Sequence, residues 1–344
     1  YPSGNDYRLV RGRAGTVKSL RERTFHERVD PELLPGLAFS EEHPPPVSLA
    51  ELAGFRAHAE APAAAVVDSG VQLRDYAAHG VAVRVFTPPG PGPHPAVYWI
   101  HGGGMIAGSA ELDTAYCSSL ALRTGTVVAA ADYRLAPEHP YPAPLEDVLA
   151  GLRWLFAAAG KLNVDPGRIA VAGSSAGGGL AAGLALLNRD QDRLPVAFLY
   201  LMYPMLDPAH TSASAREFTG IPTWNRTHSE FAWSCYLGGA DPVPPYAAPA
   251  LAEDVSGLPP VLIQTAELDL FRDEDIAFAA RLLQAGVRTE LHVYPGAYHG
   301  FELNCPDSAV GAQCLLDRNR ALIRVLHGTS IDFPLTTATK GTCS

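Results

Sequence analysis

The sequence is short of basic side chains and of long apolar runs, and each shortage argues against a class of function. Its 344 residues hold 26 Lys and Arg against 36 Asp and Glu, a net charge of −10, and show no basic stripe. This balance argues against a nucleic-acid partner. No apolar run reaches the roughly 18 residues of a membrane span. No signal-peptide pattern opens the chain, so we expect a cytoplasmic protein, although a trimmed N-terminus leaves secretion open.

Cysteine is scarce and unpatterned. The five cysteines lack the Cys-x-x-Cys spacing that is typical of zinc and redox sites. We therefore expect free thiols in a reducing compartment. Cys305 and Cys314 are nevertheless close enough in sequence for a loop disulfide, and this alternative stays open.

Short apolar segments alternate with segments of helical periodicity from about residue 65 onwards. Strand-like segments cover 81–90, 95–100, 126–134, 168–173, 196–204, 260–267 and 288–296. Helical spacing marks 145–160, 273–286 and 310–328. Strands that are apolar throughout are buried on both faces, and their alternation with helices predicts a mainly parallel sheet covered on both sides.

A cluster of small residues, Gly-Ser-Ser-Ala-Gly at 173–177, follows the apolar segment 169–172. It matches Gly-x-Ser-x-Gly in one frame only, which makes Ser175 the central residue. A strand-to-helix turn this tight strains its central residue, needs small neighbours and exposes the hydroxyl above the sheet, as a nucleophile requires. The alternatives are a structural turn that packs a helix close to a strand, or a phosphate-binding loop, so the partner residues must decide.

A second glycine cluster, His-Gly-Gly-Gly at 101–104, also follows an apolar segment. Because glycine has no Cβ, this backbone can turn two N–H groups toward one point, as a tetrahedral oxyanion requires. The rival interpretation is a dinucleotide-binding loop formed by Gly102, Gly104 and Gly108, with Asp132 as the ribose-binding acid. Its glycine spacing is not the strict one, and other strands precede it, so we favour the oxyanion loop.

Four motifs together carry a family resemblance. They are His-Gly-Gly-Gly at 101–104, Asp-Tyr-Arg-Leu-Ala-Pro-Glu at 132–138, Gly-Ser-Ser-Ala-Gly-Gly at 173–178 and His-Gly-Phe at 299–301. With them the chain resembles the hormone-sensitive lipase family of α/β-hydrolases, also called bacterial family IV esterases. The resemblance implies an α/β-hydrolase fold with a mostly helical cap. Ser174 and Gly179 stand where the family often has Asp and Asn, which bears on subgroup rather than on reaction.

The resemblance also implies which groups hold the oxyanion. These are the backbone N–H groups of Gly103, Gly104 and Ala176. We expect His101 to shape the same loop. The Asp-Tyr-Arg-Leu-Ala-Pro-Glu run at 132–138 is expected to brace it through buried ion pairs rather than to take part in chemistry.

The stretch 207–246 interrupts the strand–helix rhythm and places aromatic residues among polar ones, so it is interpreted as an inserted lobe. The expected division is residues 1–64 as the N-terminal part of the cap, 65–206 and 247–329 as the hydrolase domain, 207–246 as the cap insertion, and 330–344 as a tail. The pocket candidates in the insertion, which could equally form its own core, are Phe218, Trp224, Trp233 and Tyr236.

A serine hydroxyl needs an adjacent base, and the base needs an orienting acid. His299 follows the last strand-like segment, where a loop can reach the strand-to-helix turn at 173–177, here called the elbow, at the same end of the sheet. The acid lies between serine and histidine in the chain order of this fold. Asp269 occupies the position that the family pattern gives the acid, and Glu267 is the second candidate. The acids at 273–275 fall in the first turn of a helix, where they favour its positive end.

These residues predict a serine carboxylesterase that transfers an acyl group to water through a Ser175–His299–Asp269 triad. We expect no metal or organic cofactor. The expected partner is a small neutral ester or lactone of short to medium chain length. The resemblance also allows a homodimer. The alternative is a non-catalytic small-molecule receptor on the same fold, which the presence of all three triad residues disfavours.

Overall fold

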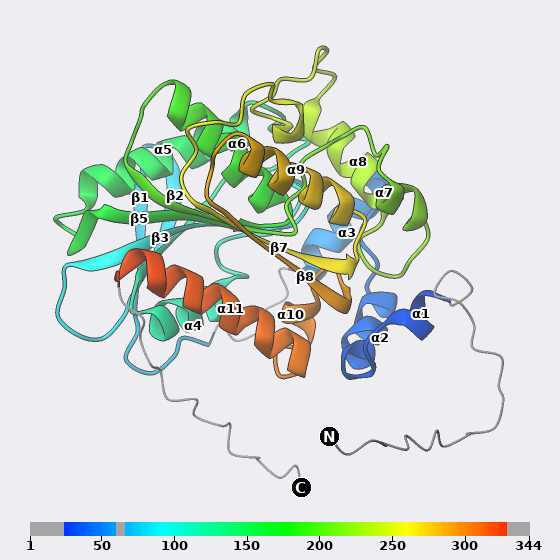
Figure 1. Ribbon diagram of the computed structural model, residues 1–344, viewed down its shortest axis with the longest axis horizontal. Coiled ribbons are helices and arrows are strands. Elements are labelled where there is room, and N and C mark those ends of the chain that lie inside the picture. Colours follow the sequence, from blue (N-terminus) through cyan, green and yellow to red (C-terminus); the bar gives the residue numbers. More distant parts are fainter. Residues whose placement is uncertain (1–23, 60–65, 329–344) are drawn as a thin grey trace, which may run out of the picture.

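One eight-stranded sheet forms the centre of the computed structural model, which describes residues 24–59 and 66–328 (Figure 1). The strands are β1 Gln72–Ala78, β2 Val81–Thr87, β3 His94–Ile100, β4 Val127–Asp132, β5 Val164–Ser174, β6 Val196–Met202, β7 Val261–Leu268 and β8 Thr289–Tyr298. Their order in the sheet is β1-β2-β4-β3-β5-β6-β7-β8. From β4 to β8 neighbouring strands run parallel, so their carboxyl ends share one edge.

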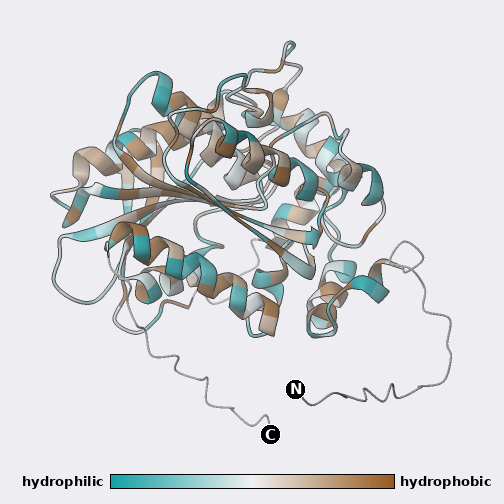
Figure 2. Ribbon diagram, in the orientation of Figure 1, coloured by the Kyte–Doolittle hydropathy of each residue, from teal (hydrophilic) through white to brown (hydrophobic). Residues whose placement is uncertain are grey.

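The central strands are apolar along most of their length, and Figure 2 shows this in the hydropathy of the sheet. Every residue of β3 is buried, as are the last six of β5. Such strands need cover on both faces, since one-sided burial produces alternation instead. The alternating pattern of β2, near the edge of the sheet, fits this distinction.

Helices lie on both faces of the sheet (Figure 1). Outside the N-terminal segment and the insertion at 207–246, the described helices are α4 Thr114–Thr124, α5 Ala143–Ala158, α6 Ala176–Asp190, α9 Arg272–Gln284, α10 Phe301–Asn304 and α11 Ala309–Leu326, with the short 3-10 turn η3 Pro249–Leu251. Helices α5, α6 and α9 cover one face, and α4 and α11 cover the other. The predicted mainly parallel sheet with helices on either side is therefore confirmed.

The N-terminal segment and the insertion lie together. The segment contains α1 Phe25–Arg28, η2 Pro31–Leu33, α2 Leu34–Glu42 and α3 Leu49–Ala59, and the insertion contains α7 Ala213–Glu217 and α8 Arg226–Leu237. Phe25 packs edge-to-face on Phe218, with ring centroids 6.2 Å apart. Arg56 donates to the carbonyls of Ile106 and Ala136, so α3 also touches the loop after β3. The division into cap and hydrolase domain stays a prediction.

Some expectations differ from the structure. The pattern did not indicate β1 or α4, and β1 and β2 pair antiparallel with their neighbours. The four described cysteines are free, so the disulfide alternative is wrong. Cys314 is buried with its Sγ 4.0 Å from Met202 Sδ, whereas the Cys305 thiol faces the carbonyl of Leu33. Cys343, the first 23 residues and the tail lie outside the described residues.

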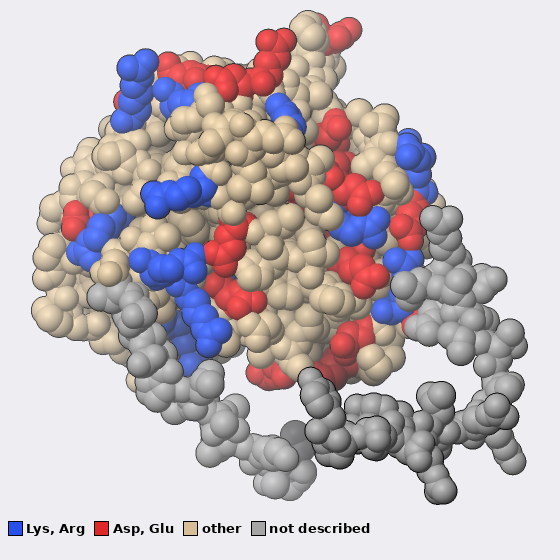
Figure 3. Space-filling model, viewed as in Figure 1, with Lys and Arg blue, Asp and Glu red and all other residues tan. Residues whose placement is uncertain are grey.

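The surface carries charges of both signs. Lys and Arg side chains are scattered among Asp and Glu on the face drawn in Figure 3. Within residues 24–59 and 66–328, no helix is both long and apolar enough to cross a lipid bilayer.

Candidate functional site

The turn between β5 and α6 holds Ser175 in a backbone conformation that L-residues rarely adopt, with φ 55° and ψ −120°. Its neighbours leave no room for a side chain. A Cβ at Gly173 would lie 2.3 Å from the carbonyl oxygen of Gly177, and a Cβ at Gly177 would lie 2.1 Å from that of Ile100. The two glycines are therefore required by close backbone approach, and strain of this kind typically persists at functional sites.

We expect Gly177→Ala to lower the free energy of unfolding by about 2 to 3 kcal/mol, because the methyl group meets backbone atoms that cannot rotate away. The carbonyls of Ile100 and His101, at 2.1 and 2.4 Å, would both have to move. Gly160→Ala is the matched control, since a Cβ there has nothing within 4 Å. Urea unfolding of both variants checks the difference, and equal stabilities would contradict the crowding of the elbow.

Ser175, His299 and Asp269 form a continuous hydrogen-bonded chain. The Ser175 hydroxyl donates to His299 Nε2 over 2.9 Å, and His299 Nδ1–H donates to Asp269 Oδ2 over 2.6 Å. Asp269 is fully buried, and its Oδ1 accepts from the Phe271 N–H at 3.0 Å. The three residues follow the ends of β5, β7 and β8. These strands lie in the order β5-β6-β7-β8, so their carboxyl ends share one edge of the sheet.

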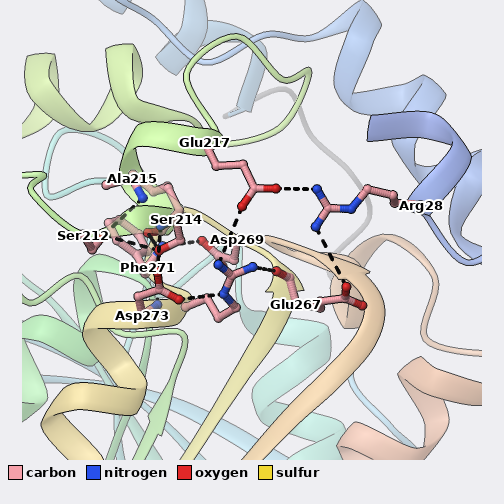
Figure 4. Close-up of polar contacts among 11 residues, drawn as sticks. Arg28, Ser212, Ser214, Ala215, Glu217, Glu267, Asp269, Phe271 and Asp273 are labelled. Carbon is pink, nitrogen blue, oxygen red and sulfur yellow. Dashed lines mark hydrogen bonds and ion pairs between the residues drawn. The ribbon is translucent and has the colours of Figure 1, made fainter. Parts of the chain in front are cut away.

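Glu267, the second candidate for the acid, points elsewhere. Its carboxylate accepts from the Gly296 N–H at 2.8 Å and lies 3.9 Å from the guanidinium of Arg28. Figure 4 shows Glu267 directed toward Arg28, apart from the loop that carries Asp269. The structure thus brings Asp269 to the histidine, while Glu267 ties the N-terminal segment to β8.

The predicted oxyanion loop lies against the elbow. Gly103 and Gly104 have φ of 105° and 64°, and a Cβ at Gly104 would lie 2.5 Å from the ring of Trp224. Gly103 O accepts from the N–H groups of Ile106 and Ala107, which closes the loop. Ala176 begins α6, so its N–H belongs to the first turn, where no intrahelical acceptor exists and the helix dipole favours negative charge.

The run at 132–138 contacts this loop mainly through hydrogen bonds, and its Glu138 pairs with Arg56, which also donates to the carbonyl of Ile106. Tyr133 donates its hydroxyl to the carbonyl of His101 at 2.9 Å and stacks on that ring, with centroids 4.1 Å apart. Asp132 accepts from the Ala110 N–H. Arg134 instead pairs with Asp147 at the start of α5. The expected ion-pair bracing is therefore wrong for Arg134, because its guanidinium contacts α5 rather than the loop.

The four aromatic candidates are placed differently. Trp224 lies against the oxyanion loop, 6.5 Å from the His299 ring. Trp233 and Tyr236 pack on each other on α8, with centroids 5.9 Å apart. Phe218 lies near the guanidinium groups of Arg28 and Arg272, each 5.6 Å from its ring centroid. Of the four, Trp224 makes the contacts nearest the triad, and Phe218 belongs to a charged cluster beside it.

Sequence reasoning missed Tyr203 and Glu302. The Tyr203 ring lies 4.2 Å from the His299 ring, and its hydroxyl donates to Glu302 Oε1 over 2.7 Å. Glu302 is buried, and burial raises the pKa of its carboxyl. Tyr203 directly follows β6, and Glu302 falls in the His-Gly-Phe-Glu run, but neither position carries a recognisable motif.

Two acids of the first turn of α9 are buried rather than exposed at the helix start. Both carboxyls are buried: that of Asp275 lies beside the Thr265 hydroxyl, and that of Glu274 beside the Asp207 backbone. Burial, with Asp269 nearby, raises the pKa of both carboxyls well above its usual value. The folded protein therefore holds protons there that the unfolded chain releases.

This sets a pH dependence of stability. A raised folded-state pKa gives stability that is complete below the unfolded-state value and is lost as pH rises toward the folded one. We expect Asp275→Asn to gain stability over the wild type as pH increases above about 4, by up to about 1.4 kcal/mol per pH unit. Glu253→Gln, at an exposed acid, is the control. Thermal unfolding from pH 4 to 9 measures both, and a constant difference would contradict the buried acid.

No group of three or more His, Cys, Asp or Glu side chains in the described ranges could hold a metal ion. The arrangement that is present consists of a serine hydroxyl hydrogen-bonded to an imidazole, a buried carboxylate bonded to the same ring, and a loop of small residues. Such a set can perform acyl transfer without help from a metal.

Comparisons with known proteins agree with this chemistry. A family profile described as alpha/beta hydrolase fold matches residues 97–303. The carboxylesterase NlhH of Mycobacterium tuberculosis is 39% identical over 227 residues, 64% of this chain and 71% of its own. The ethyl acetate hydrolase of Pseudomonas putida is 34% identical over 241 residues, 69% of this chain and 75% of its own. A solved bacterial heroin esterase is 41% identical and superimposes with a TM-score of 0.83 over 88% of this chain and 99% of its own.

Proposed function

Because the chain belongs to the alpha/beta hydrolase family, we propose that it is a carboxylesterase in which Ser175, His299 and Asp269 act as a catalytic triad. One observation supports this most directly. The His299 ring reaches Ser175 Oγ with one nitrogen, at 2.9 Å, and the buried Asp269 carboxylate with the other, at 2.6 Å. These contacts orient the base and fix its tautomer.

In the first half of the reaction Ser175 Oγ attacks the ester carbonyl while its proton passes to His299 Nε2. The Asp269 carboxylate stabilises the imidazolium that forms. The N–H groups of Gly103, Gly104 and Ala176 hold the developing oxyanion, and a single such donor is worth about 3 to 4 kcal/mol. The intermediate collapses when His299 protonates the leaving alcohol, which leaves an acyl-serine.

In the second half a water molecule takes the place of the alcohol. His299 removes its proton as the oxygen attacks the acyl carbonyl, and the same three N–H groups hold the second oxyanion. Collapse returns the proton to Ser175 and releases the acid. The turn favours both halves, since it presents the serine at the N-terminus of α6, where the helix dipole favours negative charge.

The proposed substrates are neutral esters or lactones of short to medium chain length. The Trp224 ring lies close to the oxyanion loop, so it limits the room beside the reacting carbonyl. The Ser175 side chain is also largely covered, with 7% of the residue exposed. The relative from Pseudomonas putida is named for the hydrolysis of ethyl acetate, which is a small neutral ester.

A panel of p-nitrophenyl esters from acetate to palmitate, together with simple lactones, tests this function. We expect the highest kcat/KM at acyl chains of two to about eight carbons, and a burst of p-nitrophenol as the acyl-enzyme forms. Absence of turnover on every ester, with retained tight binding of a small molecule, would instead favour the receptor alternative.

A further inference from the structure

Ser214 of the insertion makes one hydrogen bond to the loop that carries Asp269 and two to Asp273, in the first turn of α9 (Figure 4). Its hydroxyl donates to the carbonyl of Leu270 over 2.7 Å and accepts from the Asp273 N–H at 3.1 Å. Its own N–H donates to Asp273 Oδ2 over 2.7 Å. Ser214 is fully buried, so water does not compete for these bonds.

The loop held in this way is short and has no regular structure of its own. It joins β7, which ends at Leu268, to α9, which begins at Arg272. Asp269 leaves this loop toward His299, and the next carbonyl, that of Leu270, is the one that Ser214 binds. A shift of the Leu270 carbonyl, next to Asp269 in the chain, would therefore stretch a buried bond to the insertion.

The Asp273 carboxylate stays ionised and can therefore accept hydrogen bonds. Burial alone would raise its pKa, but hydrogen bonds from the Arg272 guanidinium and from Ser214 hold the pKa of Asp273 below its usual value. Arg272 Nε donates to Asp273 over 2.8 Å, and Arg272 Nη1 donates to the carbonyl of Glu267 over 2.7 Å. The acid-bearing loop is thus pinned at both of its ends.

An outer layer of charges surrounds this contact. Glu217, at the end of α7, pairs with Arg28 and lies 3.7 Å from Arg272 (Figure 4). The Glu217 side chain is 40% exposed, and ion pairs of that kind contribute little to stability. The buried serine is therefore a stronger link between the insertion and the loop than this outer layer.

Resting on the triad proposed above, we infer that Ser214 is a positioning residue for catalysis: it acts through Asp269 by anchoring the Leu270 carbonyl and Asp273. The insertion then does more than cover the substrate. It also holds the loop that carries Asp269 in place. This matters because a displacement of about 1 Å in a reacting group can cost 10²-fold in rate.

Ser214→Ala tests this inference, with Ser212→Ala as the matched control. Ser212 caps the same helix, its Oγ accepting from Ala215 N–H and lying 3.3 Å from Ser214 Oγ, but it makes no bond to the acid loop. We expect Ser214→Ala to lower kcat on p-nitrophenyl acetate about 10- to 100-fold with little change in KM. Ser212→Ala should stay within about threefold, since loss of a cap affects stability.

A double-mutant cycle separates positioning from general damage. In an Asp269→Asn background, Ser214→Ala should cost less than about twofold, because the group through which it acts is already lost. Ser214→Cys keeps the packing but bonds weakly, so it should lose kcat in the same direction even if the alanine variant folds poorly. Thermal unfolding of each variant accompanies the kinetics.

Two results would overturn the inference. One is a loss for Ser214→Ala or Ser214→Cys no larger than that of Ser212→Ala. The other is a full additional loss in the Asp269→Asn background, which would place the effect of Ser214 elsewhere. Retained activity in Asp269→Asn alone would instead refute the proposed triad, so the two failures are distinguishable.

Discussion

Ser175→Ala is expected to lower kcat on a p-nitrophenyl ester by about 10⁶-fold. The variant keeps the elbow, since alanine fits wherever serine does, but it has no oxygen to form the acyl-enzyme. His299 then faces a methyl group in place of the hydroxyl at 2.9 Å. The small remaining rate comes from the oxyanion N–H groups acting on bound substrate and water.

Ser174→Ala is the control that the sequence itself offers. Ser174 ends β5, is as buried as Ser175, and has its Oγ beside Gly102 rather than beside the histidine. We expect its kcat to stay within about threefold of the wild type. Burst amplitude and steady-state rate, measured on both variants, check the assignment. A greater loss in Ser174→Ala would mean that Ser174, not Ser175, is the nucleophile, and that Gly-x-Ser-x-Gly is the wrong alignment of this cluster.

The sequence was sufficient for the features that depend on local geometry. Glycines at 173 and 177 are needed because their positions touch backbone, and that need is visible as a motif. Continuous apolar segments indicate two-sided burial, which predicts a parallel sheet and therefore a shared edge for residues at strand ends. Ser175 and His299, 124 residues apart, could be paired in this way before any distance was known.

The features that escaped depend on which surfaces meet. The pattern places Glu274 and Asp275 in the first turn of a helix, where acids are usually solvated, but packing buries both. Phe218 was indistinguishable from Trp224 as an aromatic of the insertion, although only Trp224 contacts the oxyanion loop. Ser214 carries no motif, because its role arises from tertiary contact with a loop 56 residues away.

Asp269→Asn is the second large effect, and we expect a loss of about 10⁴-fold in kcat. An amide at this position no longer offers a negative charge to the imidazolium, and its NH₂ group can force the ring into the wrong tautomer. The Asp269 side chain is fully buried, so no water can replace the lost acceptor. The same Phe271 N–H that now binds Oδ1 would hold the amide in place, which keeps the fold intact.

Glu267→Gln distinguishes the two acids of this segment. Glu267 is partly exposed, and its contacts are the Gly296 N–H and the guanidinium of Arg28, neither of which touches the histidine. A glutamine can still accept from Gly296, so we expect kcat within about threefold and a stability change below about 1 kcal/mol. Steady-state kinetics on one short ester, run on both variants at the same pH, decides between them. If the glutamine variant is the more damaged, the orienting acid is Glu267, and the contact between His299 and Asp269 has no catalytic role.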